Sequence, residues 1–68
     1  MTPTPKQIGM KLKRLRKARK LSQYKLAQTS GVSREYIRKL EAGKSDPTVG
    51  MLQRLADALE VPLAELLS

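Results

Sequence analysis

Apolar residues recur every three or four positions through most of the chain, which is the spacing of amphipathic helices. The pattern predicts helices over residues 5–20, 23–29, 34–42, 49–60 and 62–67, and no segment alternates apolar and polar residues as a strand does. Neither repeats nor linkers interrupt the pattern. We therefore predict an all-α fold, with one compact five-helix domain over residues 1–68 and a loose segment at residues 1–3.

Helix starts are marked by residues whose side chains can accept the free N–H groups of a first turn: Thr4, Ser22, Ser33 and Thr48. Thr4 is followed by Pro5 and Gln7, which predicts a capping box with proline at the first helical position. Gly9 lowers helix propensity by about 1 kcal/mol relative to alanine. We interpret Gly9 as a point of close approach, either to a phosphate or to a neighbouring helix.

Residues 22–43 predict two short helices joined by a tight turn. Gly31 falls where the first of them must end, in a left-handed conformation that costs glycine nothing. Ala27 is small enough to let the two backbones cross closely. One face of the pair is apolar and holds Leu26, Val32, Ile37 and Leu40. The outer face of the second helix is left to Arg34, Glu35, Arg38 and Lys39.

Several short motifs follow one another in order along the chain: L-S-Q, L-A at residues 26–27, G-V-S at 31–33, I-R-K-L-E-A-G-K at 37–44, P-T at 47–48 and L-A-D-A-L-E-V at 55–61. With them the chain resembles the phage repressor and Cro-like helix-turn-helix proteins, the XRE family, from about residue 8 to residue 67. The resemblance implies a lambda-repressor-like fold. It also implies a sequence-specific regulator of transcription, a repressor, that binds double-stranded DNA with its third helix in the major groove.

Length and composition narrow the function further. The 68 residues include no cysteine and no histidine, which excludes disulfides and removes the commonest metal ligands and general base, so we expect no cofactor and no enzymatic activity. No apolar run approaches the roughly 20 residues that span a bilayer. We expect a cytoplasmic protein with no membrane partner and no small-molecule effector. A membrane-active peptide built on residues 5–20 is disfavoured by the capped helices that follow.

The charge of the chain is unevenly placed. Residues 1–44 hold 13 of the 14 lysines and arginines and only two carboxylates, a net charge of +11, whereas residues 45–68 carry −3, which together give +8. A solvated basic face would explain a charge run taken alone. Combined with the helix pair, the asymmetry favours a polyanion on one side of the fold.

The family resemblance implies that Arg34, Glu35 and Lys39 contact bases. Arginine or lysine favours guanine, and a carboxylate accepts a hydrogen bond from the amino group of cytosine. Glu35 has two other interpretations: it could orient a neighbouring arginine, or pair with Lys39 four residues later, which contributes only about 0.3 kcal/mol.

A second set of residues is predicted to meet the DNA backbone. The resemblance implies that Gln23 touches the backbone and steadies a reading residue, and that Lys44 lies in the loop whose amides meet phosphate. Ser33 is a helix cap, a phosphate ligand or both. Tyr36 either stacks on a sugar or covers the core, and Arg38 is either solvated or bound to DNA. Charge alone supports the remaining candidates, which are Arg19, Lys20 and Lys25.

Two further expectations concern structure. The resemblance implies an ion pair between Arg16 and Glu41, which would join the first helix to the end of the third. The apolar residues Leu59, Leu63, Leu66 and Leu67 belong to the core, or leave enough apolar surface for a weak homodimer through the fifth helix or on DNA. An alternative function is that of an antitoxin, which binds a toxin partner as well as its own promoter.

Overall fold

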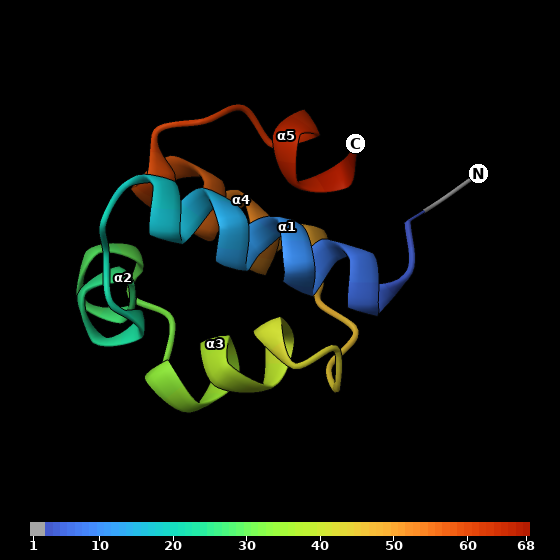
Figure 1. Ribbon diagram of the computed structural model, residues 1–68, viewed down its shortest axis with the longest axis horizontal. Helices are drawn as coiled ribbons and strands as arrows, with labels where there is room; N and C mark the ends of the chain where they lie inside the picture. Colours follow the sequence, from blue (N-terminus) through green and yellow to red (C-terminus); the bar gives the residue numbers. More distant parts are fainter. Residues whose placement is uncertain (1–2) are drawn as a thin grey trace.

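The computed structural model describes residues 3–68 and contains five helices: α1 Pro5–Ala18, α2 Gln23–Ser30, α3 Arg34–Glu41, α4 Val49–Leu59 and α5 Ala64–Leu67 (Figure 1). Within these residues there is no strand, and the predicted all-α architecture is confirmed. Each helix boundary lies within two residues of its expected position. Residues 1 and 2, which belong to the segment expected to be loose, lie outside the described residues.

All four predicted helix caps are present. The hydroxyl groups of Ser22, Ser33 and Thr48 accept from the backbone N–H three residues later, and Thr4 forms the predicted reciprocal capping box with Gln7. Gly31 ends α2 with φ +74°, in the left-handed region that the turn requires. The turn between α2 and α3 was therefore predictable from residue types alone.

Two helices, α1 and α5, are each two residues shorter than expected, because of backbone hydrogen bonds that the residue types do not predict. Lys20 is left-handed, with φ +58°, and the Leu21 N–H donates to the Arg16 carbonyl at 3.1 Å, which closes α1 at Ala18. At the other end of the chain, Glu65 N–H donates to the Pro62 carbonyl three residues before it. That tighter turn delays the start of α5 from residue 62 to residue 64.

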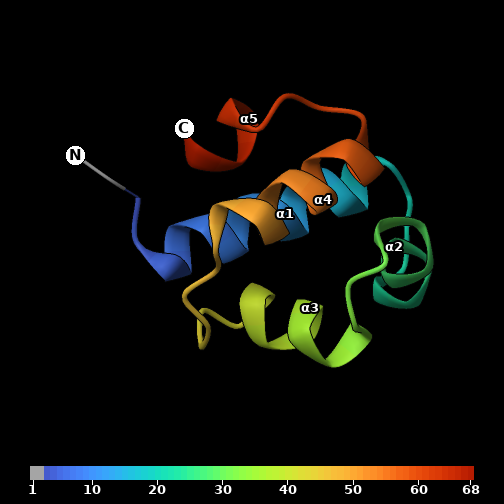
Figure 2. The same cartoon turned by 180° about the vertical axis from the view of Figure 1, so that it is seen from behind.

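The core lies between the helices, with α3 on one side of α1 and α5 on the other (Figures 1 and 2). Its fully buried large side chains come from all five helices: Leu12, Leu26, Ile37, Leu40, Leu55, Leu59 and Leu66. Val32, in the turn, is buried as well, so the predicted apolar face of the helix pair is confirmed. Ala27 is partly buried against this core. Burial of each such side chain contributes about 1.5–3 kcal/mol. Ile37 and Leu40 therefore fix α3 to the rest of the fold.

Gly9 lies at a close contact between the backbones of α1 and α3. A Cβ added to Gly9 would overlap the carbonyl oxygen of Leu40 and would lie 3.2 Å from Cα of Glu41. Of the two interpretations of this glycine, close approach to a neighbouring helix is therefore correct. The contact holds the backbone of α1 directly against the C-terminal half of α3.

Candidate nucleic-acid interface

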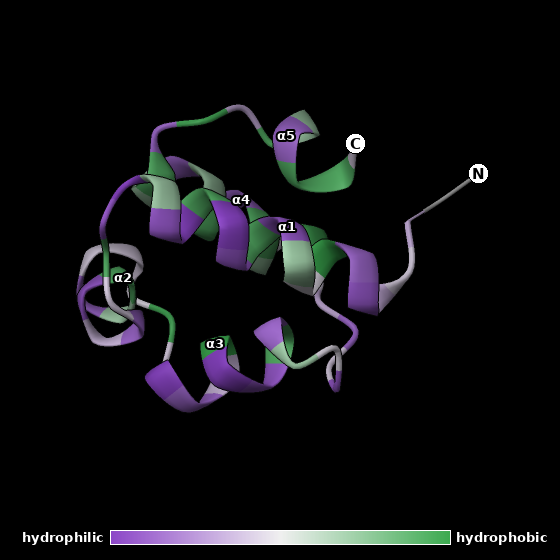
Figure 3. Ribbon diagram, viewed as in Figure 1, coloured by the Kyte–Doolittle hydropathy of each residue, from purple (hydrophilic) through white to green (hydrophobic). Residues whose placement is uncertain are grey.

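The outer face of α3 is polar and exposed along its length. Arg34, Glu35, Arg38 and Lys39 are all exposed, whereas Ile37 and Leu40 on the opposite face are fully buried. Figure 3 shows the same division on α3, whose outer side is hydrophilic while hydrophobic residues lie on the side toward α1. The predicted base-reading residues thus share one accessible surface on a helix that is anchored from behind.

Glu35 pairs with a neighbouring arginine, Arg38, as one interpretation of the sequence predicted, and not with Lys39 as another did. Arg38 Nε donates to Glu35 Oε1 at 3.2 Å, and Arg38 Nη2 donates to the other carboxylate oxygen. The planar guanidinium offers two parallel donors that match a carboxylate, which a lysine cannot do. The hydrogen bond from Arg38 lowers the pKa of Glu35 and raises the pKa of Arg38. Glu35 is therefore held as a carboxylate beside Arg34 and Lys39.

Replacing Arg38 by glutamine should raise the pKa of Glu35. The hydrogen bond from Arg38 is the largest cause of the lowered pKa, ahead of the charges of Lys39 and Arg34. Because the folded-state pKa of Glu35 is depressed, the stabilisation from the pair is present above the unfolded-state pKa and is lost as pH falls through the folded-state value. An NMR titration of the side-chain carboxyl carbon measures the midpoint. Lys39→Gln should move that midpoint less, and an equal rise in both variants would contradict the assignment.

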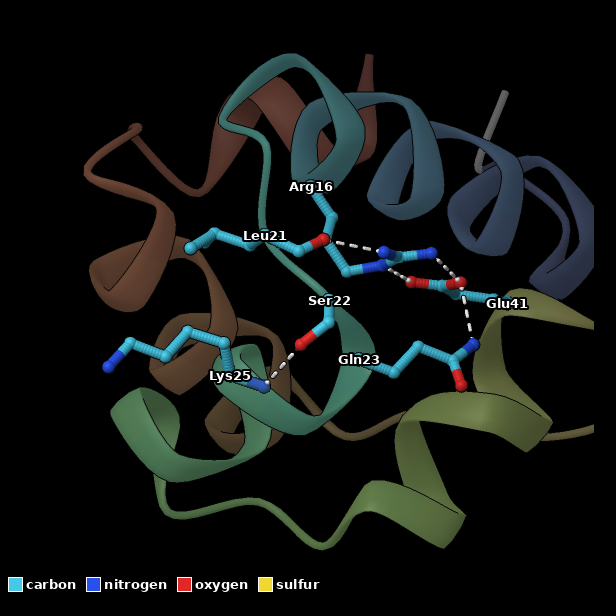
Figure 4. Close-up of polar contacts among 6 residues, drawn as sticks. All are labelled: Arg16, Leu21, Ser22, Gln23, Lys25 and Glu41. Carbon is cyan, nitrogen blue, oxygen red and sulfur yellow. Dashed lines mark hydrogen bonds and ion pairs between the residues drawn. The ribbon is translucent and has the colours of Figure 1, made fainter.

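Behind α3, a nearly buried polar cluster joins three segments of the chain (Figure 4). Arg16 donates to both carboxylate oxygens of Glu41, at 2.7 and 3.0 Å, and also to the Leu21 carbonyl at 2.7 Å. Gln23 Nε2 donates to Glu41 Oε1 at 3.0 Å. The side chains of Arg16 and Glu41 are only 9% and 4% exposed, and the ion pair that the resemblance implied is present.

This cluster sets the position of α3. Glu41 is the last residue of α3, Arg16 belongs to α1 and Gln23 begins α2, so one carboxylate ties the helix pair to α1. Gln23 thus steadies Glu41, and its amide oxygen points away from the carboxylate (Figure 4). The sequence gives no signal for the Leu21 carbonyl, because any residue type carries one.

The other residues predicted to contact the DNA backbone differ in whether their polar groups are already engaged within the protein. The Ser33 hydroxyl accepts from the Tyr36 N–H at 3.1 Å, which is the capping role. The Lys44 N–H donates to the Lys39 carbonyl at 3.0 Å, so Lys44 has its exposed side chain, and not its amide, to offer a phosphate. Tyr36 is partly buried and packs against the core. The Lys25 side chain points away from the buried cluster (Figure 4).

Arg19, one of the candidates that charge alone supported, pairs with another residue of the chain. Its guanidinium donates to Glu60 Oε1 at 2.9 Å and to the Glu60 carbonyl at 3.3 Å, at the C-terminal end of α4. Glu60 is left-handed, with φ +58°, and exposes carbonyl groups that a cation stabilises. We assign Arg19 to this helix end, which the sequence did not predict because the partners are 41 residues apart.

Across residues 3–68, no three His, Cys, Asp or Glu residues come together as metal ligands would. None of the five helices combines the length and the apolarity that crossing a bilayer requires.

Comparison with known proteins identifies the family. The family model described as helix-turn-helix, HTH_3, matches residues 12–66. The chain is 40% identical over 63 residues to the HTH-type transcriptional regulator y4dJ of Sinorhizobium fredii, covering 93% of this chain and 82% of that protein. It is 33% identical over 57 residues to the immunity repressor of Bacillus phage phi105, covering 84% of this chain but only 40% of the repressor.

A solved structure agrees with this assignment. The restriction-modification controller protein C.AhdI from Aeromonas hydrophila is 35% identical, with a TM-score of 0.89 over 91% of this chain and 94% of that one. Because a family model and a relative of similar length both match nearly the whole domain, the chain belongs to the HTH_3 helix-turn-helix family of DNA-binding transcriptional regulators.

Proposed function

We propose that the chain is a repressor that binds a specific duplex operator by placing α3 in the major groove. The observation that carries the proposal is the anchored and exposed face of α3, which presents Arg34, Glu35 and Lys39 together on a helix fixed by Gly9 and Glu41. A major groove admits one α-helix, and residues near the N-terminus of that helix reach base edges. Arg34 and Lys39 would read guanine, and Glu35 would accept from cytosine.

Contacts to phosphate would position this helix. Gln23 is the first residue of α2, and the N–H groups of a first helical turn have no intrahelical acceptor, which favours an anion there. The side chains of Lys25 and Lys44 are exposed, and Ser33, Tyr36 and Arg38 lie on or beside α3. Such contacts fix register without carrying sequence information.

Repression would follow from occlusion of polymerase at the operator. The likeness to a phage immunity repressor supports this direction of control, although the chain spans only two fifths of that protein. The relatives named above are a regulator, a repressor and a controller protein, which favours this function over the antitoxin.

We also propose that dimers are weak and form on DNA. Leu59 and Leu66 are buried in the core of their own chain, and Leu63 is partly buried, which leaves Leu67 as the exposed leucine of that group. Stable interfaces bury about 1,200–2,000 Å² in total. Two half-sites about 34 Å apart would instead bring two copies together on the duplex.

Selection of bound duplexes from a random pool tests the function. We expect a pseudo-palindromic motif with two half-sites, and affinity for it that falls with salt at a slope of about −0.9 per phosphate contacted. Lys39→Gln should cost about 1–3 kcal/mol and relax specificity at one position, whereas Lys44→Gln should weaken all sequences alike. Equal affinity for the selected and scrambled duplexes would refute the proposal.

A further inference from the structure

Three lysines of α1 form a row beside α3. Lys6, Lys13 and Lys17 are exposed, and their spacings of seven and four residues place them on one side of the helix. That side adjoins the end of α3: a Cβ on Gly43 would lie 3.3 Å from Cβ of Lys6. Along α1, Gly9 packs directly against Leu40 of α3. We call Lys6, Lys13 and Lys17 the α1 lysine row.

The row has no carboxylate partner within the described residues. The ion pairs of residues 3–68 join Arg16 to Glu41, Arg19 to Glu60 and Arg38 to Glu35. Both carboxylates of residues 1–44 are therefore already engaged by arginines. Lys13 and Lys17, four residues apart on one helix, repel each other in the free protein. A polyanion would relieve that repulsion.

We propose that the α1 lysine row binds the phosphate backbone of the duplex along the groove that α3 occupies. The inference rests on the proposed function, because it places DNA at α3. A helix lying in a groove has a sugar-phosphate strand on each side, and α1 packs directly against α3. The long lysine side chains can thus reach a strand that the exposed face of α3 does not. The row adds affinity and salt dependence, and it reads no bases.

Other basic residues of the chain provide a matched control. Lys11 lines a shallow groove with Met10, Arg14 and Leu67, at the α5 side of α1, and Arg54 is exposed on α4. The variants Lys13→Gln/Lys17→Gln and Lys11→Gln/Arg54→Gln therefore remove the same charge from different faces. All four residues lie outside the buried core, so both variants should melt near the parent temperature.

The test measures binding of the parent chain and both double variants to the selected duplex and a scrambled duplex across salt concentrations. For Lys13→Gln/Lys17→Gln, the magnitude of the salt slope should fall by about 2. The parent chain should bind DNA more tightly than this variant, and the ratio of their affinities should fall about tenfold between about 50 and 200 mM salt. The preference for the selected duplex should stay unchanged. The control variant should keep a slope close to that of the parent.

Lysine acetylation in the presence of the selected duplex gives an independent measurement, with Lys13 and Lys17 protected and Lys11 modified. If the salt slope fell equally in both double variants, the effect would come from net charge alone and not from the α1 lysine row, which would overturn the proposal. It would also be overturned if Lys13→Gln/Lys17→Gln bound DNA like the parent but lost binding to phosphatidylserine vesicles. Failure of the proposed function looks different, because the parent chain itself would not distinguish the two duplexes.

Discussion

Replacing Glu41 by alanine should lower the free energy of unfolding by about 3–5 kcal/mol, because it leaves the buried Arg16 guanidinium without its counter-ion. The Gln23 amide loses its acceptor in the same step. For a domain of this size, each kcal/mol corresponds to roughly 4–8 °C in melting temperature. Denaturant unfolding followed by circular dichroism measures the loss, which is a large part of the roughly 5–15 kcal/mol that holds small domains folded.

Arg19→Gln is the matched control, since it breaks the exposed pair with Glu60, in which the arginine is 42% and the glutamate 77% exposed. Pairs of that kind contribute under about 1 kcal/mol. The double variant Arg16→Met/Glu41→Leu should recover much of the loss, because removing both charges avoids an unpaired ion. It should not recover all of it, since the Leu21 carbonyl and Gln23 lose a partner. Similar stability of Glu41→Ala and Arg19→Gln would contradict the assigned burial.

The two kinds of structural feature in this chain differ in how far sequence predicts them. Caps such as Ser33 and turns such as Gly31 depend on residues a few positions apart, so residue type and spacing are sufficient. A pairing that depends on how helices pack is different, as when Arg19 pairs with Glu60 across 41 residues. Within α3 the spacing allows Glu35 to pair with either Arg38 or Lys39, and the two donors of the guanidinium favour Arg38. The ion pair of Arg16 and Glu41 was predictable only through the family resemblance.

The residues proposed to read bases show the same limit at the candidate site. Sequence placed Arg34, Glu35 and Lys39 on an exposed face because helical periodicity assigns faces. It left open whether a neighbouring arginine or Lys39 pairs with Glu35, and it did not show that Lys6 adjoins the end of α3. Both facts depend on side-chain and interhelical geometry. The arrangement of charged side chains around α3 therefore needs a structure, even though the helix itself was predicted from sequence.

Replacing Gly9 by alanine should destabilise the domain by at least about 2 kcal/mol, although alanine is the better helix former by about 1 kcal/mol. The added Cβ would overlap the Leu40 carbonyl oxygen, and overpacking of a closed contact costs about 1–3 kcal/mol and at times more. Gly50→Ala is the matched control, because its Cβ would meet only Thr48 Oγ1, at 3.9 Å. We expect that variant to be neutral or up to about 1 kcal/mol more stable by denaturant unfolding.

A double variant can show whether the new Cβ clashes with the backbone of α3 or with a side chain, because the obstructing atom differs between the two cases. The obstructing atom belongs to the backbone of α3, so trimming the Leu40 side chain cannot make room for the new Cβ. Gly9→Ala/Leu40→Ala should therefore be less stable than either single variant, because the lost leucine adds about 2–5 kcal/mol of its own. If the double variant were more stable than Leu40→Ala alone, the conflict would lie with the side chain. Stabilisation by Gly9→Ala, matching Gly50→Ala, would mean that α1 and α3 are not in backbone contact.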